Sequence, residues 1–257
     1  MVVVSDFHCG HQAGLTPPGW QFSTDSSDAS RKKYGEHQRY LWDFYYTWIC
    51  RLKPIEILAV NGDAIDGKGP KTGGTEQITT DRVRQMTMAK ECIEVAEAKK
   101  IIMTHGTGYH VGSEDDFETP LAKSVGADIV SHHDFSVNGT VFNFRHKIAT
   151  STIPHGRNTA AARTALWDLI WSVKKGKVRA DVLIRSHAHY FIYQGDTDTL
   201  AIITPGLQGV GSKFGTRECE GIVDIGITWF DIEEDGTYEW QTKLLDMKPM
   251  IDDPTEL

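Results

Sequence analysis

The first residues that could do chemistry follow an apolar run at the start of the chain. Val2, Val3 and Val4 lead directly into Asp6 and His8, which stand two positions apart. A continuous β-branched run predicts a buried strand, and ligand groups in α/β sheets collect beyond the carboxyl ends of strands. An aspartate oxygen and a histidine nitrogen that face one point suit a divalent transition metal. Taken alone, the pair is more often an ordinary strand-to-loop turn.

The same pattern returns four more times along the chain. Further short apolar runs end in Asp63, in the loop that holds His105 and His110, in His146, and in His187 and His189. One isolated histidine is usually a structural residue, but five strand ends with metal-ligand side chains indicate a shared site. Two carboxylates and at least three histidines exceed the needs of one tetrahedral metal. They are enough for two metals that share a bridging carboxylate.

The segments between these runs must position them, and several have a helical pattern. Apolar residues three and four positions apart predict helices over residues 36–52, 76–98 and 158–175, and an acid-rich first turn predicts a short helix over 114–125. Asn138-Gly139 between alternating runs predicts a β-hairpin within residues 128–146. Residues 10–34 lack an apolar period and predict a long loop, which is either a mobile excursion or a cover for substrate.

Composition narrows the class of protein. The chain has 257 residues, of which 40% are hydrophobic, so one large or two small domains with a substantial core are expected. A formal net charge of −8 argues against broad binding of duplex nucleic acid, without excluding a local basic groove. No apolar run is long enough to span a membrane, and no signal peptide is visible.

The cysteines are scattered and form no metal-binding or disulfide pattern. Cys9, Cys50, Cys92 and Cys219 lie far apart, which favours a reducing compartment, and we expect a cytoplasmic protein. Cys9 stands beside His8, where a small filler is expected more than a soft metal ligand.

Taken in order, the strand-end motifs resemble those of the calcineurin-like metallophosphoesterases. The resemblance covers residues 1–189 and rests on Asp6-Phe7-His8, Gly62-Asp63-Ala64-Ile65-Asp66, the Gly- and His-containing loop, the lone His146 and His187-Ala188-His189. It implies a single α/β domain over residues 1–257, built as a two-layer β-sheet sandwich flanked by helices. It also implies two divalent transition-metal ions, with Mn expected first and Fe, Zn or Ni as alternatives.

The resemblance further implies a role for each strand-end residue. One metal would take Asp6, His8 and His189, the other would take His146 and His187, and Asp63 would bridge them. Two cations about 3.5–4 Å apart can bind a phosphoryl group and generate a nucleophilic hydroxide near neutral pH.

The chain departs from the family pattern at the third motif. Thr107 stands where the family has a metal-binding Asn, and two residues separate it from His110. We expect His110 to be the general acid that protonates the leaving group. His105 or His110 could instead supply the missing ligand, and His110 could also be an exposed loop residue.

The leading interpretation is a metal-dependent phosphoesterase. Phosphodiesters of nucleic acid or nucleotides are favoured over phosphomonoesters or phosphoproteins as substrate, since no separate protein-docking domain is visible. Basic residues near loops could reach phosphate, although each could equally be solvated surface: Lys68, Lys71, Arg157, Arg163, Lys213 and Arg217. A catalytically degenerate member that binds metal or a partner, and a mononuclear zinc hydrolase, are the alternatives. Nothing in the sequence indicates the oligomeric state.

Overall fold

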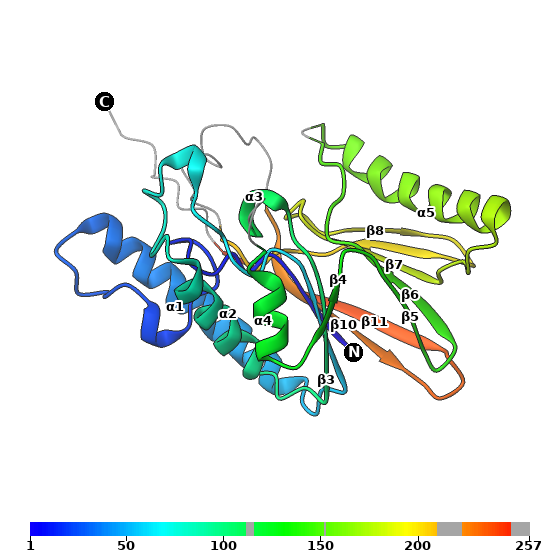
Figure 1. The fold of residues 1–257 in the computed structure, drawn as a ribbon, viewed down its shortest axis with the longest axis horizontal. Helices are drawn as coiled ribbons and strands as arrows, with labels where there is room; N and C mark the ends of the chain where they lie inside the picture. Colours follow the sequence, from blue (N-terminus) through cyan, green and yellow to red (C-terminus); the bar gives the residue numbers. More distant parts are fainter. Residues whose placement is uncertain (112–115, 152, 210–222, 248–257) are drawn as a thin grey trace.

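Two β-sheets pack against each other, and helices cover both outer faces (Figure 1). The computed structural model describes residues 1–111, 116–151, 153–209 and 223–247. Three residues singled out in the sequence, Lys213, Arg217 and Cys219, lie outside these ranges. The arrangement is the two-layer α/β sandwich expected from the sequence.

The first sheet holds the N-terminal strands. Its six strands run in the order β11 (Tyr238–Leu245), β10 (Ile225–Ile232), β1 (Val2–Val4), β2 (Ile57–Asn61), β3 (Lys100–Thr104) and β4 (Asp128–Val130). The strands β1 to β4 are parallel, and Val4, Val60 and Met103 stand side by side across three of them. The chain therefore leaves β1, β2 and β3 at the same edge of the sheet.

The second sheet holds the strands from the middle of the chain. Its order is β5 (His133–Val137), β6 (Thr140–Phe144), β7 (Val182–Arg185), β9 (Leu200–Ile203) and β8 (Ile192–Gly195). The expected hairpin is confirmed as β5 and β6, because Asn138 and Gly139 both have positive φ, as a type I′ turn requires. The apolar run at residues 128–130 does not join this hairpin, since it pairs with β3 in the other sheet.

Helices cover the outer face of each sheet. Figure 1 shows α1 (Ala29–Arg51), α2 (Arg82–Glu94) and α4 (Glu118–Ser124) on one side of the molecule and α5 (Gly156–Lys175) on the other. A single turn, α3 (Gly108–Val111), and two 3-10 turns, η1 (Pro18–Trp20) and η2 (Pro70–Thr72), complete the described helices. None of these helices is long and apolar enough to cross a membrane.

The first residues of α1 and α2 differ from the sequence prediction, and N-terminal caps explain both. The side chain of Asp28 accepts from Arg31 N at 3.1 Å, so α1 begins well before residue 36 and the preceding loop is shorter than predicted. The side chain of Asp81 accepts from Val83 N at 2.9 Å, so α2 begins later than residue 76.

Three apolar layers separate the four layers of structure. Alternate residues of the first sheet, among them Val3, Ala59 and Ile102, face Phe142 and Phe144 of the second sheet in the central layer. The residues between them point the other way and pack against α1 and α2. Because β-strand side chains alternate between faces, a fully buried strand reads as the continuous apolar run seen in the sequence.

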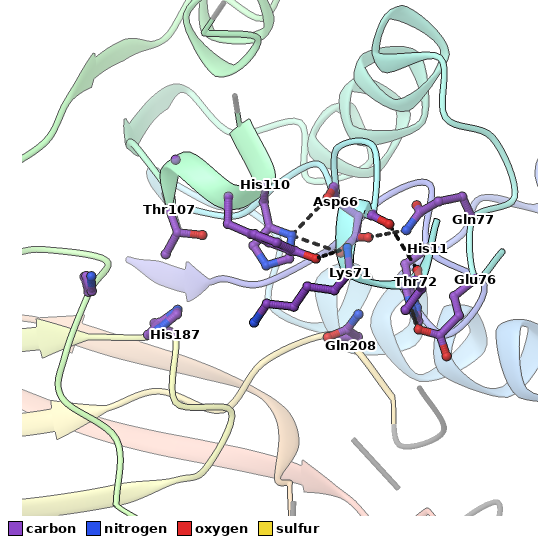
Figure 2. Close-up of a pocket in the computed structure, with 14 residues that line it drawn as sticks. His11, Asp66, Lys71, Thr72, Glu76, Gln77, Thr107, His110, His187 and Gln208 are labelled. Atoms are coloured by element: carbon purple, nitrogen blue, oxygen red, sulfur yellow. Dashed lines mark hydrogen bonds and ion pairs between the residues drawn. The ribbon is translucent and has the colours of Figure 1, made fainter. Parts of the chain in front are cut away.

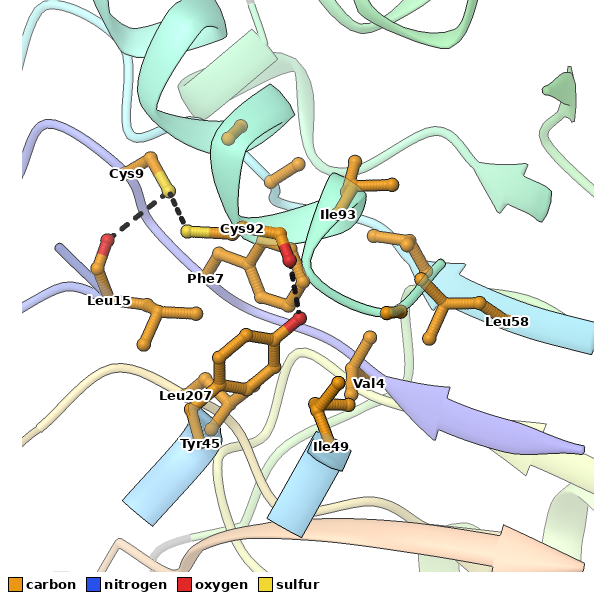
Figure 3. Packing of buried hydrophobic residues seen from close by; sticks show 14 of the residues in the cluster. Val4, Phe7, Cys9, Leu15, Tyr45, Ile49, Leu58, Cys92, Ile93 and Leu207 are labelled. Atoms are coloured by element: carbon orange, nitrogen blue, oxygen red, sulfur yellow. Dashed lines mark hydrogen bonds between the residues drawn. The ribbon is translucent and has the colours of Figure 1, made fainter. Parts of the chain in front are cut away.

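The layer beneath α1 and α2 also holds two of the cysteines (Figure 3). Tyr45 Oη donates to Cys92 O at 2.7 Å, and the Sγ atoms of Cys9 and Cys92 lie 3.8 Å apart in the same cluster. The Cys9 thiol donates to Leu15 O at 3.2 Å. Cys9 is thus a small side chain of the core, as expected.

Candidate metal centre

The strand ends of the two sheets bring all six expected metal ligands together with His110. Their nitrogen and oxygen atoms form three overlapping groups, each within 4.8 Å: Asp6, His8 and His189; His8, Asp63 and His110; Asp63, His146 and His187. The donors come from the loops after β1, β2, β6 and β7 and from α3, which follows β3. Asp63 and His8 each belong to two groups and so connect all three.

The backbone at these donors is unusual. Seven non-glycine residues have positive φ among the described part of the chain, and five of them are candidate ligands: Asp6 (53°), His8 (45°), Asp63 (51°), His187 (69°) and His189 (51°). A left-handed conformation costs an L-residue about 1–2 kcal/mol. Such outliers cluster at functional sites, where the surrounding structure holds them in place.

In the first group, three buried or half-buried side chains crowd one point. Asp6 Oδ1 lies 3.1 Å from His189 Nε2 and 3.7 Å from His8 Nε2. The two imidazole Nε2 atoms are themselves 3.2 Å apart. Two ring nitrogens and a carboxylate oxygen that converge in this way need a cation or a shared proton between them.

In the group of Asp63, His146 and His187, one buried nitrogen has no hydrogen-bond partner. His146 Nδ1 lies 2.7 Å from Asn61 O, which places a proton on Nδ1 and directs Nε2 toward Asp63. This Nε2 is 3.0 Å from Asp63 Oδ2 and forms no hydrogen bond with it. His187 Nδ1 lies 3.9 Å from the same oxygen. A buried ring nitrogen without a hydrogen-bond partner needs an explanation such as a bound ion, and the donors around it fit a divalent metal.

Buried negative charge dominates the electrostatics of the centre. Burial alone would raise the pKa of Asp6 and of Asp63, but the neighbouring histidines outweigh it and lower both. Burial would lower the pKa of His146, yet Asp63 and Asp6 raise it to about 9. The two carboxylates thus stay ionised and attract positive charge.

Asp66 orients two of the histidines, and its role was not predicted. Its Oδ1 lies 2.7 Å from His8 Nδ1 and 3.2 Å from His110 Nδ1, and its Oδ2 accepts from Gln77 Nε2 at 2.7 Å. Burial would raise its pKa, but the hydrogen bonds from His110 and His8 lower it well below the usual value. A carboxylate behind a ligating histidine fixes the tautomer and the direction of the ring. The only sequence signal was its place at the end of the motif that contains Asp63.

The third motif supports Asp63 with backbone and hydroxyl groups. Thr107 N donates to Asp63 Oδ1 at 2.7 Å, and Thr107 Oγ1 lies 3.3 Å from both carboxylate oxygens. Gly106 permits this approach, since a Cβ there would come within 2.0 Å of Asp63 Oδ1. His105 turns away to Asp116 and Thr119, each 3.2 Å from its Nε2. Of the two histidines considered for the missing ligand, the structure brings His110 alone to the centre.

Two further polar residues hold the strand ends in register, and the sequence prediction missed them. Glu118 is fully buried and accepts from Ala64 N at 2.8 Å and Gly106 N at 2.6 Å; burial and Asp63 raise its pKa to about 8. Asn61 Nδ2 donates to Ser186 Oγ at 2.7 Å, and its Oδ1 accepts from Thr104 Oγ1 at 2.6 Å. These bonds tie β2 and β3 to the end of β7.

A cavity of about 500 Å³ opens beside the donors (Figure 2). His110, Thr107 and His187 lie toward the centre, and η2 with its neighbours contributes Lys71 and Gln77. Of the basic residues expected near phosphate, Lys71 lines this cavity. Arg163, which lies on α5, lines a different cavity. Arg157 instead lies 4.6 Å over the Tyr190 ring.

No protein-family model matches the chain, and no curated protein matches it in sequence. Solved structures do align with it over most of its length. An archaeal phosphodiesterase is 16% identical, and the alignment covers 95% of this chain and 98% of that one with a TM-score of 0.49. YfcE, a phosphoesterase from E. coli, is 11% identical over 93% of this chain and 97% of its own, with a TM-score of 0.44.

Zinc-complexed Vps29 from Entamoeba histolytica is 13% identical over 95% of this chain and 97% of its own, with a TM-score of 0.41. At these identities, the roles of individual residues rest on the geometry of this chain.

Proposed function

We propose that the protein is a metal-dependent phosphoesterase that hydrolyses phosphodiesters, with nucleic acid or nucleotides as the substrate class. The observation that carries the proposal is the convergence of Asp6, Asp63 and four histidines in overlapping groups of donor atoms, with His146 Nε2 buried and without a hydrogen-bond partner. The unpaired cysteines Cys9, Cys50 and Cys92 favour action in the reducing cytoplasm.

The donor set supports two divalent transition-metal ions, with Mn expected first and Fe, Zn or Ni as alternatives. One ion would be held by Asp6, His8 and His189, the other by His146 and His187, with Asp63 shared. Carboxylate and imidazole ligands without thiolate are compatible with all of these metals. When bound, such ions supply Lewis acidity toward phosphoryl oxygens and lower the pKa of water.

The residues around the centre have separate tasks in this proposal. His110 lines the cavity and donates a proton to the leaving oxygen, and Asp66 holds its Nδ1 with the backbone oxygen at 2.9 Å and with Oδ1 at 3.2 Å. Asp66 also holds His8 in the orientation that points its Nε2 at Asp6 and His189. Thr107 fixes the carboxylate of Asp63 and so replaces the expected Asn as a support, without equivalent strength as a ligand.

The test is hydrolysis of bis(4-nitrophenyl) phosphate by protein freed of metal and then titrated with Mn, Fe, Zn or Ni. Metal-dependent turnover, with close to two ions bound per chain, is the expected result. Faster turnover of 4-nitrophenyl phosphate than of the diester would replace the substrate class by phosphomonoesters. Binding of ions with no turnover of either ester would show a degenerate centre, and saturation at one ion would show a mononuclear site.

A further inference from the structure

A groove runs between α5 and the chain that follows β6, on the side of the molecule away from α1 and α2. It has a volume of about 480 Å³ and is lined by Arg145 and Lys147 on one side and by Arg163, Trp167 and Trp171 of α5 on the other. We call it the α5 groove. The activity proposed above does not use it.

The α5 groove concentrates positive charge on a chain whose net charge is −8. Its lining holds five basic residues and one acid, Asp168, which is bound to Lys177 at 2.6 Å. Arg145, Lys147 and Arg163 have no acidic partner among the residues that the structure describes, and Arg145 Nε is buried without a hydrogen-bond partner. Three cations are therefore available to an anionic ligand.

Two tryptophans complete the groove. Trp167 and Trp171 are 56% and 52% exposed, although large aromatic residues are normally well covered. They stand four positions apart on α5, with Arg163 four positions earlier, so the three lie along one flank of the helix. From Arg163 to Trp171 the helix rises about 12 Å. Cations interleaved with exposed aromatic rings are typical of sites that bind single-stranded nucleic acid, where the rings stack on bases.

The groove leads to the metal centre. Arg145 and Lys147 flank the candidate ligand His146 in the sequence, and both line a neighbouring cavity that also holds His146. Lys147 in addition lines the cavity that contains His110 and His187. Arg145 and Lys147 thus line both the α5 groove and a cavity beside the donors.

We propose that the α5 groove binds single-stranded nucleic acid and leads one of its phosphodiesters to the metal centre. The inference rests on the proposed function and deepens it, since it names an extended strand as the substrate. A second copy of this chain fits the groove poorly, because a two-fold contact would place like charges opposite each other. The other exposed apolar residues of α5, Leu166, Leu169 and Val173, do not line the groove.

The test is binding of fluorescein-labelled, phosphorothioate-linked oligothymidine and oligouridine of about 12 nucleotides to the metal-loaded protein, followed by anisotropy. Trp171→Ala should weaken binding by roughly 5- to 150-fold, and Trp171→Phe should retain most of the affinity. Wild-type binding should fall with salt with a log–log slope of about −2, and Arg163→Gln should reduce the slope by about 0.7. Because these side chains are exposed, each variant should melt like the wild type.

Matched controls lie on the same helix. Val173→Ala removes exposed apolar surface, and Lys174→Gln removes a charge, both outside the groove, and neither should change binding. Three results would each refute binding of single-stranded nucleic acid in the α5 groove. These are equal affinity of Trp171→Ala and wild type, tighter binding of a duplex than of either single strand, and equal losses of affinity in the control variants.

The chromogenic diester separates the two proposals. If wild-type protein hydrolyses the small diester but binds neither strand, the groove proposal fails and the phosphoesterase stands. If the strands bind through Trp171 and Arg163 but no diester is cut, the groove stands and the phosphoesterase fails.

Discussion

Asp66 offers a sharp test of the centre, because its two oxygens serve different partners. Oδ1 lies against His8 Nδ1 and His110 Nδ1, and Oδ2 accepts from Gln77 Nε2. An asparagine has only one acceptor oxygen. Gln77 Oε1, however, is buried and has no hydrogen-bond partner among the described residues, so a rotated Gln77 amide could accept from the new NH₂ group. Asp66→Asn should therefore remove the charge and keep the geometry, whereas Asp66→Ala removes both.

The size of each effect follows from what is lost. Removing the partner behind a ligating histidine typically costs about 10–100-fold in metal affinity or activity, or about 1.4–2.7 kcal/mol. We expect about 10-fold for Asp66→Asn and about 100-fold for Asp66→Ala. Mn affinity would be measured by competition with a chromophoric chelator, and kcat/KM with bis(4-nitrophenyl) phosphate.

Two further variants test this interpretation of Asp66. Asp43→Ala removes an exposed carboxylate of α1 and should change neither quantity. Adding Gln77→Ala to Asp66→Asn should bring the loss to the level of Asp66→Ala, because the new NH₂ group then has no acceptor. Wild-type Mn affinity and turnover in Asp66→Ala would refute the assignment of Asp66 as the residue that positions His8.

Three other predictions follow from the same structure. Asp63→Asn should lower turnover more than Asp6→Asn at limiting Mn, since Asp63 belongs to two donor groups and Asp6 to one. Near-normal turnover of Asp63→Asn would refute the assignment of Asp63 as the bridging ligand. His110→Ala should slow an alkyl phosphodiester by about 10²–10⁴-fold and spare a nitrophenyl ester at unchanged metal content, whereas loss of metal would make His110 a ligand. Burial and nearby His11 lower the pKa of His37 to about 4, so the folded protein holds this ring neutral where the unfolded chain, with a pKa near 6.5, protonates it. The free energy of unfolding therefore carries no penalty from His37 above about pH 6.5 and falls by about 3 kcal/mol in total as the pH drops from there to about 4. Urea denaturation of His37→Gln should show a free energy of unfolding that depends less on pH in this range. The same pH dependence as in the wild type would contradict the assignment.

The sequence sufficed for the strands and for the donors that follow them, because both are local patterns. The runs that end before Asp6, Asp63 and His187 are buried on both faces and so are almost continuously apolar, whereas the strand before His146 also holds Thr140 and Asn143. The hairpin at Asn138-Gly139 was equally local, since its turn type depends on two residues. Helix beginnings were less accurate, because the caps Asp28 and Asp81 lie outside the apolar periodic stretches.

The supporting residues could not be predicted, because their partners are distant in the sequence. Glu118 bonds to Ala64, 54 positions away, and stands beside acidic residues that read as a solvated run. Asn61 reaches Ser186 across 125 positions. No local pattern distinguishes a buried, doubly bonded glutamate from an exposed one until the tertiary structure brings the backbone donors to it.

The left-handed backbone links the strand pattern to the centre. A positive φ departs from the extended conformation and ends a strand. Asp6, Asp63 and His187 are each the second residue after the last residue of β1, β2 and β7, and each has positive φ. Gly106 takes the same place after β3, where a Cβ would collide with Asp63. At β1, β2 and β7 the donor itself thus takes the left-handed conformation just beyond the strand, which is why an apolar run followed closely by Asp or His was so informative.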